Sequence, residues 1–224
     1  MKERLVIPEI LDSLPDDDPE AIRSRRDLRL VNGFMGNYRW VARQIRETPE
    51  DLVSEWVEVG AGDGHLVSMF SEEEVERLSV TGLDFISRPG NWPSRWGWRQ
   101  SDVFDGLGEN PSRDRGIIAN LFLHHFEPED LRRLGDVIDR ECSRLVFSEP
   151  ARYPFFRFAS CFFDPFVNRV TRYDMRVSIG AGFRKGELPT SLGLGDEWEI
   201  RDSTSILGAY RLEAWRRVEK KSPS

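Results

Sequence analysis

The hydrophobic residues of the chain fall into two patterns: short apolar runs, and longer segments with apolar positions at helical spacing. The strand-like runs begin near residues 56, 78, 96, 116 and 144, and each leads into a turn or a polar segment. Such runs are typical of strands buried on both faces, whereas the segments between them are typical of amphipathic helices. The alternation predicts an α/β protein with a parallel sheet and right-handed crossovers.

Three segments carry signals for the start of a helix. Asp18-Pro19-Glu20 combines a capping acid, a proline at the first helical position and a second acid near the positive end of the helix dipole. Ser71 with Glu74 forms a capping-box pattern, which predicts two short helices rather than one after the preceding strand. Glu127-Pro128 starts a helix that we expect to run to about Arg140.

The last third of the chain differs from the rest in its pattern of apolar and aromatic residues. Residues 198–203 and 209–215 alternate between apolar and polar positions, which predicts a terminal antiparallel hairpin. Before it, seven aromatic residues crowd the segment 153–166, and we expect most of them to pack against the sheet as part of an ordinary helix. Residues 179–183 contain two glycines and are predicted to form a flexible turn.

Composition and charge limit the class of protein. The chain has 224 residues, which suits one sizeable α/β domain, and 39% of them are hydrophobic. No run is long enough to span a membrane, and residues 1–5 lack the apolar core of a secretory signal, so we expect a cytoplasmic location. The net charge of −7 argues against a nucleic-acid partner held mainly through phosphate contacts. The two cysteines are predicted to be small core residues, and the three histidines show no zinc-binding spacing, so no metal is expected.

The most informative segment follows the first strand. Glu58 ends an apolar run, and Gly60, Gly62 and Gly64 follow at intervals of two residues. A strand, a tight glycine turn and a helix start allow backbone N–H groups to approach a nucleotide-like ligand closely. A dinucleotide fingerprint would place its third glycine one position later, where this chain has His65. A phosphate-binding P-loop would end in Gly-Lys-Ser/Thr, which is absent.

The Glu-x-Gly-x-Gly-x-Gly pattern resembles motif I of the class I S-adenosylmethionine-dependent methyltransferases, and residues 116–126 resemble motif IV of that family. The resemblance covers about residues 52–150. It implies a single Rossmann-like domain with a mostly parallel seven-stranded sheet, a C-terminal antiparallel hairpin and helices on both faces. We expect a helical cap over residues 1–50 and a methyltransferase domain over 51–224, with a substrate-binding insert near 153–190.

The resemblance also implies a binding site for S-adenosylmethionine. By analogy, Asp84 would accept hydrogen bonds from the ribose hydroxyls, Asp102 would accept from the adenine amino group, and Asn120 would contact the methionine part. The full set expected to bind the cofactor is Glu58, Gly60, Ala61, Gly62, Gly64, Asp84, Phe85, Asp102, Val103, Asn120 and Leu121.

Two further groups of residues are candidates for the acceptor side of the reaction. His124 and His125 follow the fourth strand, where open α/β sheets place ligands, and either is a candidate general base. Both histidines serve equally well as loop anchors. A polar cluster after the aromatic segment is predicted to bind the substrate: Arg169, Arg172, Tyr173 and Asp174. Ion pairing at the surface is an alternative role for the two arginines, and helix capping is an alternative role for Asp174.

The sequence therefore predicts methyl transfer from S-adenosylmethionine to a small, aromatic or apolar metabolite, with oxygen as the favoured acceptor atom. Transfer to carbon or nitrogen stays open, as does the oligomeric state. Two alternatives remain: a catalytically silent protein that binds the cofactor or a partner on the same fold, and an NAD-dependent oxidoreductase on the related dinucleotide-binding fold.

Overall fold

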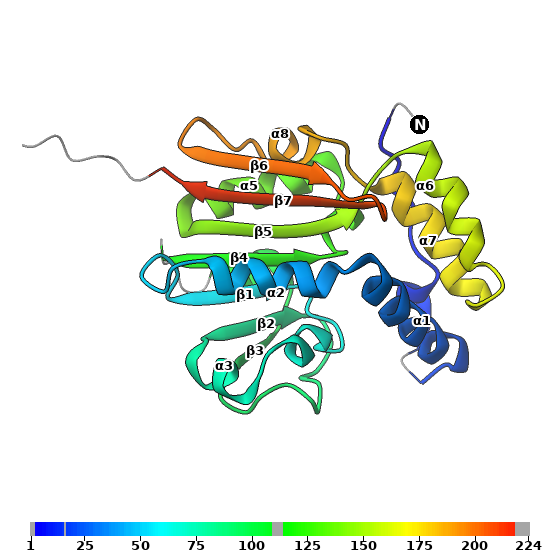
Figure 1. Ribbon diagram of the computed structural model, residues 1–224, viewed down its shortest axis with the longest axis horizontal. Coiled ribbons are helices and arrows are strands. Elements are labelled where there is room, and N and C mark those ends of the chain that lie inside the picture. The colour runs from blue at the N-terminus through cyan, green and yellow to red at the C-terminus, as the bar shows by residue number, and fades with distance from the viewer. Residues whose placement is uncertain (1–2, 16, 109–113, 218–224) are drawn as a thin grey trace, which may run out of the picture.

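A computed structural model describes residues 3–15, 17–108 and 114–217 of the chain. The described residues form one seven-stranded sheet with the order β3-β2-β1-β4-β5-β7-β6 (Figure 1). Strand β7 runs antiparallel to both of its neighbours, and the other pairings are parallel, as the sequence predicts. The strands are β1 (Glu55–Val59), β2 (Val80–Asp84), β3 (Gly97–Gln100), β4 (Arg115–Asn120), β5 (Cys142–Pro150), β6 (Trp198–Thr204) and β7 (Ala209–Arg216).

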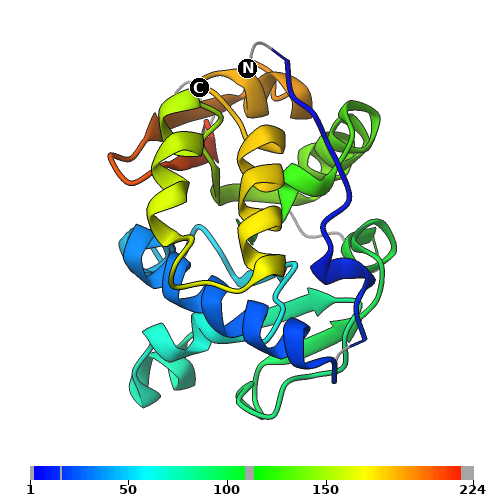
Figure 2. The same cartoon turned by 90° about the vertical axis from the view of Figure 1, so that its right-hand side faces the viewer.

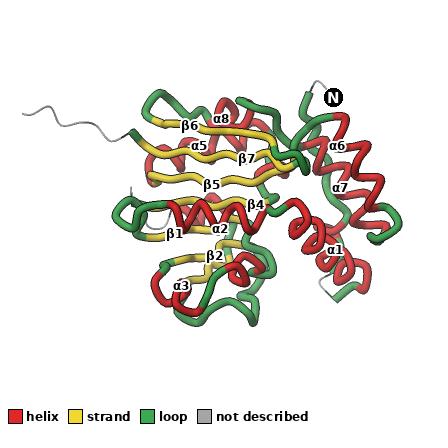
Figure 3. Tube along the Cα trace, viewed as in Figure 1, coloured by secondary structure: helices red, strands yellow, loops and turns green. Residues whose placement is uncertain are grey.

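Helices cover both faces of the sheet and the carboxyl ends of its parallel strands (Figure 3). None of the described helices is long and apolar enough to cross a membrane. The α-helices are α1 (Pro19–Met35), α2 (Asn37–Glu47), α3 (Glu72–Arg77), α4 (Val103–Gly108), α5 (Pro128–Glu141), α6 (Pro154–Ala159), α7 (Arg169–Ala181) and α8 (Glu187–Leu192). Short 3-10 helices are η1 (Leu11–Ser13), η2 (His65–Met69), η3 (Leu123–His125) and η4 (Ser160–Phe163).

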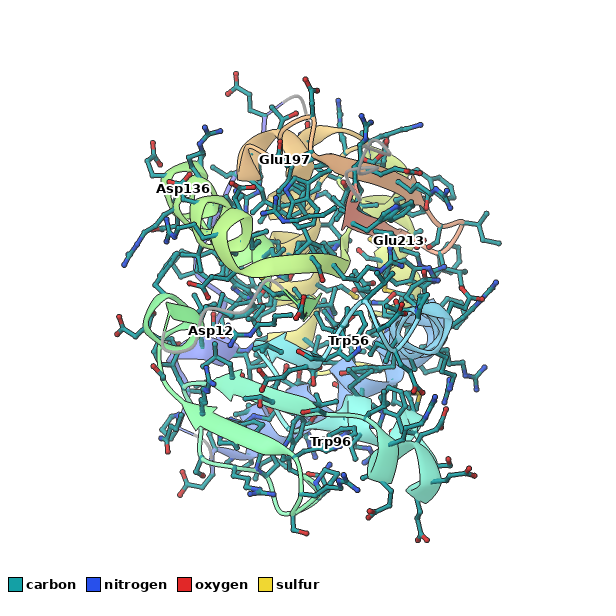
Figure 4. The ribbon with its side chains drawn as sticks, turned by 90° about the vertical axis from the view of Figure 1, so that its left-hand side faces the viewer. Asp12, Trp56, Trp96, Asp136, Glu197 and Glu213 are labelled. Atoms are coloured by element: carbon teal, nitrogen blue, oxygen red, sulfur yellow. The ribbon has the colours of Figure 1, made fainter. Side chains whose placement is uncertain are left out.

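The core is divided by the sheet into two layers. Successive side chains of a strand point to opposite faces, so Val57 and Ile117 join one cluster and Trp56 and Ile118 join the other. The first cluster lies between the sheet and helices α4, α5 and α8. The second lies under α2 and contains several tryptophans, of which Trp56 and Trp96 are labelled in Figure 4. Burial on both faces explains why the central strands are continuous apolar runs in the sequence.

The helix starts predicted from capping signals are confirmed. The Asp18 side chain accepts a hydrogen bond from the Glu20 N–H at the start of α1. Ser71 and Glu74 form both hydrogen bonds of a capping box at the start of α3, which follows the separate short helix η2. Local side chain–backbone hydrogen bonds therefore mark these boundaries, and at α3 the capping residue Glu74 is also held by Arg46 of α2.

Several expectations for residues 153–183 are wrong. Residues 179–181 continue α7 instead of forming a flexible turn, and Asn168, rather than Asp174, caps this helix. Most phenylalanines of the segment 153–166 do not pack on the sheet, because α6 and η4 lie beyond the carboxyl ends of the strands (Figure 1). Cys142 is buried as predicted, but Cys161 is exposed.

The first fifty residues pack in two different ways. Helix α2 lies directly on the sheet, against β4 and β5, whereas α1 packs against α7. Residues 3–15 cross the same end of the molecule as a strap: the Ile10 and Leu11 N–H groups donate to the Asp174 carboxylate, at 2.7 and 3.0 Å. The division of the chain into a cap and a domain near residue 50 stays a prediction.

Gly135 provides a test of the packing between α5 and α8. A Cβ atom at this position would lie 1.7 Å from the Leu192 carbonyl oxygen. We expect Gly135→Ala to lower the free energy of unfolding by about 3 kcal/mol, because backbone atoms must move apart. Gly33→Ala in α1 is the matched control, since nothing lies within 4 Å of its added Cβ. Urea unfolding should show that alanine at this exposed helical position raises the free energy of unfolding by about 0.5–1 kcal/mol. Equal changes in the free energy of unfolding for Gly135→Ala and Gly33→Ala would contradict the close packing of α5 on α8.

Candidate functional site

The turn after β1 has the backbone conformation that the glycine spacing predicts. Gly60, Gly62 and Gly64 have φ values of +66°, +53° and +70°, in the left-handed region that disfavours residues with a Cβ. A Cβ on Gly60 would meet the Phe122 ring at 2.3 Å, and one on Gly64 would lie 3.0 Å from Trp92. A Cβ on Gly62 would meet no atom closer than 4.0 Å. Gly60 and Gly64 are thus constrained by protein neighbours, and Gly62 borders open space.

Carboxylates from the next two strand ends lie near this turn. The Asp84 Oδ2 atom accepts a hydrogen bond of 2.8 Å from the Gly62 N–H, and its Oδ1 atom accepts one of 3.1 Å from the Ile86 N–H. Phe85 beside it is exposed. Asp102 accepts from the Phe104 N–H at 2.8 Å at the start of α4, whose first residue, Val103, is buried. These side chains come together because parallel strands end at one edge of the sheet.

Two buried polar atoms near the turn have no hydrogen-bond partner among the described residues, Glu58 Oε2 and Asn120 Oδ1. Burial raises the pKa of Glu58 well above its usual range, and the nearby Asp84 and Asp63 carboxylates raise it further. The Nδ2 atom of Asn120 donates to Asn32 Oδ1 at 3.4 Å, and the Tyr38 hydroxyl is a further neighbour of this amide, since burial raises the Tyr38 pKa and hydrogen bonding with Asn120 opposes that rise. Unsatisfied buried acceptors are costly, and in a cleft they indicate a missing donor such as a ligand ammonium.

The loop after β4 is held by one carboxylate. Leu121 has a φ of +54°, which is strained for a residue with a Cβ. Glu149, at the end of β5, accepts hydrogen bonds from the Phe122 and Leu123 N–H groups at 3.0 and 2.9 Å. These bonds fix the chain reversal and determine where the following histidines lie.

His124 is fully enclosed between two carboxylates. Its Nδ1 atom lies 2.8 Å from Glu149 Oε2, and its Nε2 atom lies 3.4 Å from Glu9 Oε1. Burial opposes the charged form of the imidazole, but the hydrogen bonds and charges of the two carboxylates outweigh it and raise the pKa to about 9. A protonated ring with both nitrogens engaged cannot accept a proton at neutral pH.

His125 occupies a different environment. Its side chain is 30% exposed, and its Nδ1 atom lies 3.6 Å from Asp12 Oδ2, which belongs to the strap. Its ring stacks at a tilt on His124, with centroids 4.2 Å apart. Burial and the charge on His124 lower the pKa of His125 to about 4. This imidazole is therefore neutral at pH 7 and has no hydrogen-bond partner for Nε2 among the described residues.

Glu9, His124 and His125 bring three ligand atoms within 4.8 Å of one another, an arrangement that could hold a metal ion. The sequence shows no sign of it, because Glu9 lies 115 residues from His124. The carboxylates of Glu9 and Glu149 already neutralise a protonated His124, and Ser178 donates a hydrogen bond to Glu9. Glu9 and His124 are therefore satisfied by protein groups, whereas His125 Nε2 has no hydrogen-bond partner among the described residues.

The residues predicted to bind the substrate do not all face the site. Asp174 is buried, and its carboxylate accepts from the strap backbone. Arg172 donates to the Asp164 carbonyl oxygen at 2.6 Å, whereas Arg169 and Tyr173 are exposed on α7. Sequence reasoning missed Arg4, which donates to the His124 carbonyl oxygen at 2.7 Å and places the strap beside the histidines.

The chain was compared with known proteins. No protein-family model matches the sequence, and a search of curated proteins finds no match. Solved structures do match. The plantazolicin methyltransferase BpumL, in complex with a triazolic desmethylPZN analog and SAH, has a TM-score of 0.64 at 11% identity, over 90% of this chain and 92% of that one. This chain has the class I methyltransferase fold. The structure of human N-acetylserotonin methyltransferase in complex with SAM also matches this chain. Its TM-score is 0.55 at 13% identity, and the match covers 92% of this chain and 61% of that one. This chain also matches the pyocyanin biosynthetic protein PhzM, with a TM-score of 0.58 at 16% identity over 94% and 62%.

The environment of His124 gives a prediction for stability. Its folded-state pKa of about 9 exceeds the ordinary value of 6.5, so its stabilising contribution is complete below pH 6.5 and is lost as the pH rises through about 9. We expect the free energy of unfolding to fall by roughly 3 kcal/mol between pH 6.5 and pH 9.5 in urea titrations. A wild-type free energy of unfolding that stayed constant over this pH range would contradict the charged assignment of His124.

Proposed function

We propose that this protein transfers a methyl group from S-adenosylmethionine to a small molecule. The observation that carries the proposal is the open face of Gly62, which lies near two unsatisfied buried oxygens, Glu58 Oε2 and Asn120 Oδ1. A ligand with an adenosyl group and an amino-acid tail suits this arrangement. The tail supplies an ammonium for the two oxygens, and the bare main chain of the turn allows the rest of the molecule to approach closely.

Each predicted cofactor residue then has a physical role. Asp84 accepts hydrogen bonds from the ribose hydroxyls, and Asp102 accepts from the adenine amino group beside the exposed ring of Phe85. The backbone of Gly60, Ala61 and Gly64 shapes the turn, while Val103, at the start of α4, and Leu121, directly after β4, follow neighbouring strand ends. The bound cofactor supplies a sulfonium-linked methyl group for direct displacement, and the protein orients the acceptor in line with it and excludes water.

We propose oxygen as the acceptor atom and His125 as the general base. Of the two histidines, only His125 is neutral at pH 7 and has a ring nitrogen without a partner among the described residues. The Asp12 carboxyl, 3.6 Å from Nδ1, is within ion-pair distance of the ring but beyond hydrogen-bond distance, and Nε2 would take the proton of a hydroxyl group as the new bond forms. His124 holds the loop in place.

The solved structures support a small-molecule or peptide-derived acceptor. BpumL is described with desmethylPZN analogs, and the human neighbour is named for N-acetylserotonin. The aromatic residues of α6 and η4, near the same end of the sheet, favour an aromatic or apolar acceptor. Arg169 and Tyr173, exposed on α7, are the candidates to contact its polar groups.

Calorimetric titration of the full chain with S-adenosylhomocysteine tests the cofactor assignment. We expect binding with release of a proton, because the ligand ammonium stabilises the ionised form of Glu58, whose pKa is raised in the free protein. Binding should therefore tighten as the pH rises from 6 to 8. Glu58→Gln should weaken binding by about tenfold or more and remove the proton release. Tighter binding of NAD than of S-adenosylhomocysteine would overturn the proposal.

A further inference from the structure

Four phenylalanines of α6, η4 and the following turn are exposed to an unusual degree. The exposed fractions of Phe155, Phe158, Phe162 and Phe166 are 67%, 72%, 75% and 79%. Phe155 and Phe158 lie in α6, Phe162 lies in η4, and Phe166 lies in the turn that follows. Single exposed apolar side chains are ordinary, but a contiguous group of large ones marks an interaction site. We call these four residues the aromatic face.

Neighbouring elements extend the aromatic face. Phe34 of α1, itself exposed, contacts Phe163 edge-to-face with ring centroids 5.4 Å apart. On the other side, the tight turn between β6 and β7 lies against α6, since a Cβ on Gly208 would be 2.9 Å from the Phe156 ring; this turn carries the exposed Ile206. Figure 2 shows α1, α6 and α7 together on one side of the molecule.

The charge around the aromatic face is opposite to that of the whole chain. Residues 19–35 and 153–176 contain eight arginines and four acidic residues, in a protein whose net charge is −7. Three of the eight arginines are paired with acids, Arg29 with Asp63 and both Arg172 and Arg176 with Asp164. Two of the four acids are buried: Asp27 accepts from the Asn168 N–H, and Asp174 accepts from the strap. Arg157 and Arg169 are exposed beside the phenylalanines. The surface therefore combines apolar rings with excess positive charge.

We propose that the aromatic face docks on an anionic lipid bilayer, with the phenylalanine rings at the level of the headgroups and the arginines against lipid phosphates. Exposed aromatic side chains next to basic residues are the combination that binds membrane surfaces without spanning them. A symmetric dimer through this face would place each group of arginines against its own copy, so charge complementarity favours the lipid surface. The proposal does not require methyl transfer, but it gives a second role to Arg169 and to phenylalanines of α6 and η4 that the proposed function places near the acceptor, so vesicle binding is measured without cofactor or acceptor.

Sedimentation with vesicles tests the proposal on the full chain. We expect binding to vesicles of phosphatidylcholine with one third phosphatidylglycerol, weak binding to phosphatidylcholine alone, and release from the anionic vesicles at high salt. Phe158→Ala with Phe162→Ala should lower the partition coefficient at least tenfold. Arg157→Gln with Arg169→Gln should lower it by about fivefold for each arginine. All four side chains are exposed, so thermal unfolding should change little, and that measurement shows whether each variant is folded.

Matched variants elsewhere on the surface serve as controls. Leu52→Ala removes an exposed apolar side chain far from the aromatic face, and Arg43→Gln with Arg140→Gln removes two exposed positive charges. These variants should bind the anionic vesicles like the wild type. Equal losses in the control and test variants would overturn the proposal, as would equal binding to neutral and anionic vesicles. A dimer in solution that dissociates in the phenylalanine variant, without vesicle binding by the wild type, would assign the face to a second copy of the chain instead.

Discussion

Gly62→Ala is expected to weaken the binding of S-adenosylhomocysteine by about 100-fold, equivalent to about 2.7 kcal/mol. The added methyl group would project into the open space beside the turn, where the proposed cofactor approaches the main chain. The fold should tolerate the change, because no protein atom lies within 4 Å of the added Cβ except the Gly60 carbonyl oxygen, at 4.0 Å. The positive φ alone should cost about 1–2 kcal/mol of stability. Calorimetric titration and urea unfolding measure the two effects separately.

Gly186→Ala is the matched control for this substitution. Gly186 also has a positive φ, +81°, and nothing lies within 4 Å of its added Cβ, but it precedes α8, away from the glycine turn. The control should show the same small loss of stability with unchanged affinity. If Gly62→Ala retained its affinity, the assigned binding face would be wrong, whatever happened to stability.

The second large effect is expected at His125. Once an acceptor has been identified, His125→Asn should lower kcat by about 100-fold or more, because loss of a positioned general base typically lowers the rate by a factor between about 10² and 10⁴. The KM for the cofactor should change little. Since burial and the charge on His124 lower the pKa of His125 to about 4, the wild-type rate should persist down to about pH 5 instead of falling near pH 6.5. Formation of S-adenosylhomocysteine under saturating cofactor measures both quantities.

The variant Asp12→Asn tests whether Asp12 helps to position the His125 ring, as distinct from the proton transfer that His125 itself carries out. The Asp12 carboxyl lies 3.6 Å from His125 Nδ1, so its loss should lower kcat by less than the loss of the imidazole does. An unchanged kcat in His125→Asn would remove general-base catalysis by this residue and leave positioning as the main contribution. His124→Gln is unsuitable as the comparison, because it leaves the buried carboxylates of Glu9 and Glu149 without their partner.

Those parts of the fold that depend on local chemistry were predictable from the sequence. The capping residues Asp18 and Ser71 determine helix starts through hydrogen bonds to their own neighbours, and the buried strands appear as apolar runs. The glycine turn was predictable because the left-handed conformation at Gly60, Gly62 and Gly64 strongly favours glycine. The mostly parallel sheet and its terminal antiparallel hairpin followed from the alternation of the predicted elements and the resemblance to a known family.

Features that depend on distant residues were not predictable. Nothing in the local sequence of Glu9 indicates that it lies beside His124, and the two adjacent histidines differ only through what the fold places around them. The phenylalanines of α6 have the spacing of a core helix, but the helix lies beyond the ends of the strands, where no sheet is available to cover them. The period of apolar positions shows which residues lie on the same side of a helix, but it does not show what that side packs against.

The strap has a consequence for the order in which the molecule is assembled. Ile10 and Leu11 bind a carboxylate more than 160 residues further along the chain, and Glu9 reaches a histidine 115 residues away. The strap is synthesised before all of these partners: its contacts with the histidine loop need residues up to 125, and its contacts with Asp174 need α7. Contacts of such long range form late and slow the folding reaction. A nascent chain that has completed β1 to β5 would therefore lack the anchor on α7 that fixes Ile10 and Leu11, which delays a complete reaction centre until α7 has been made.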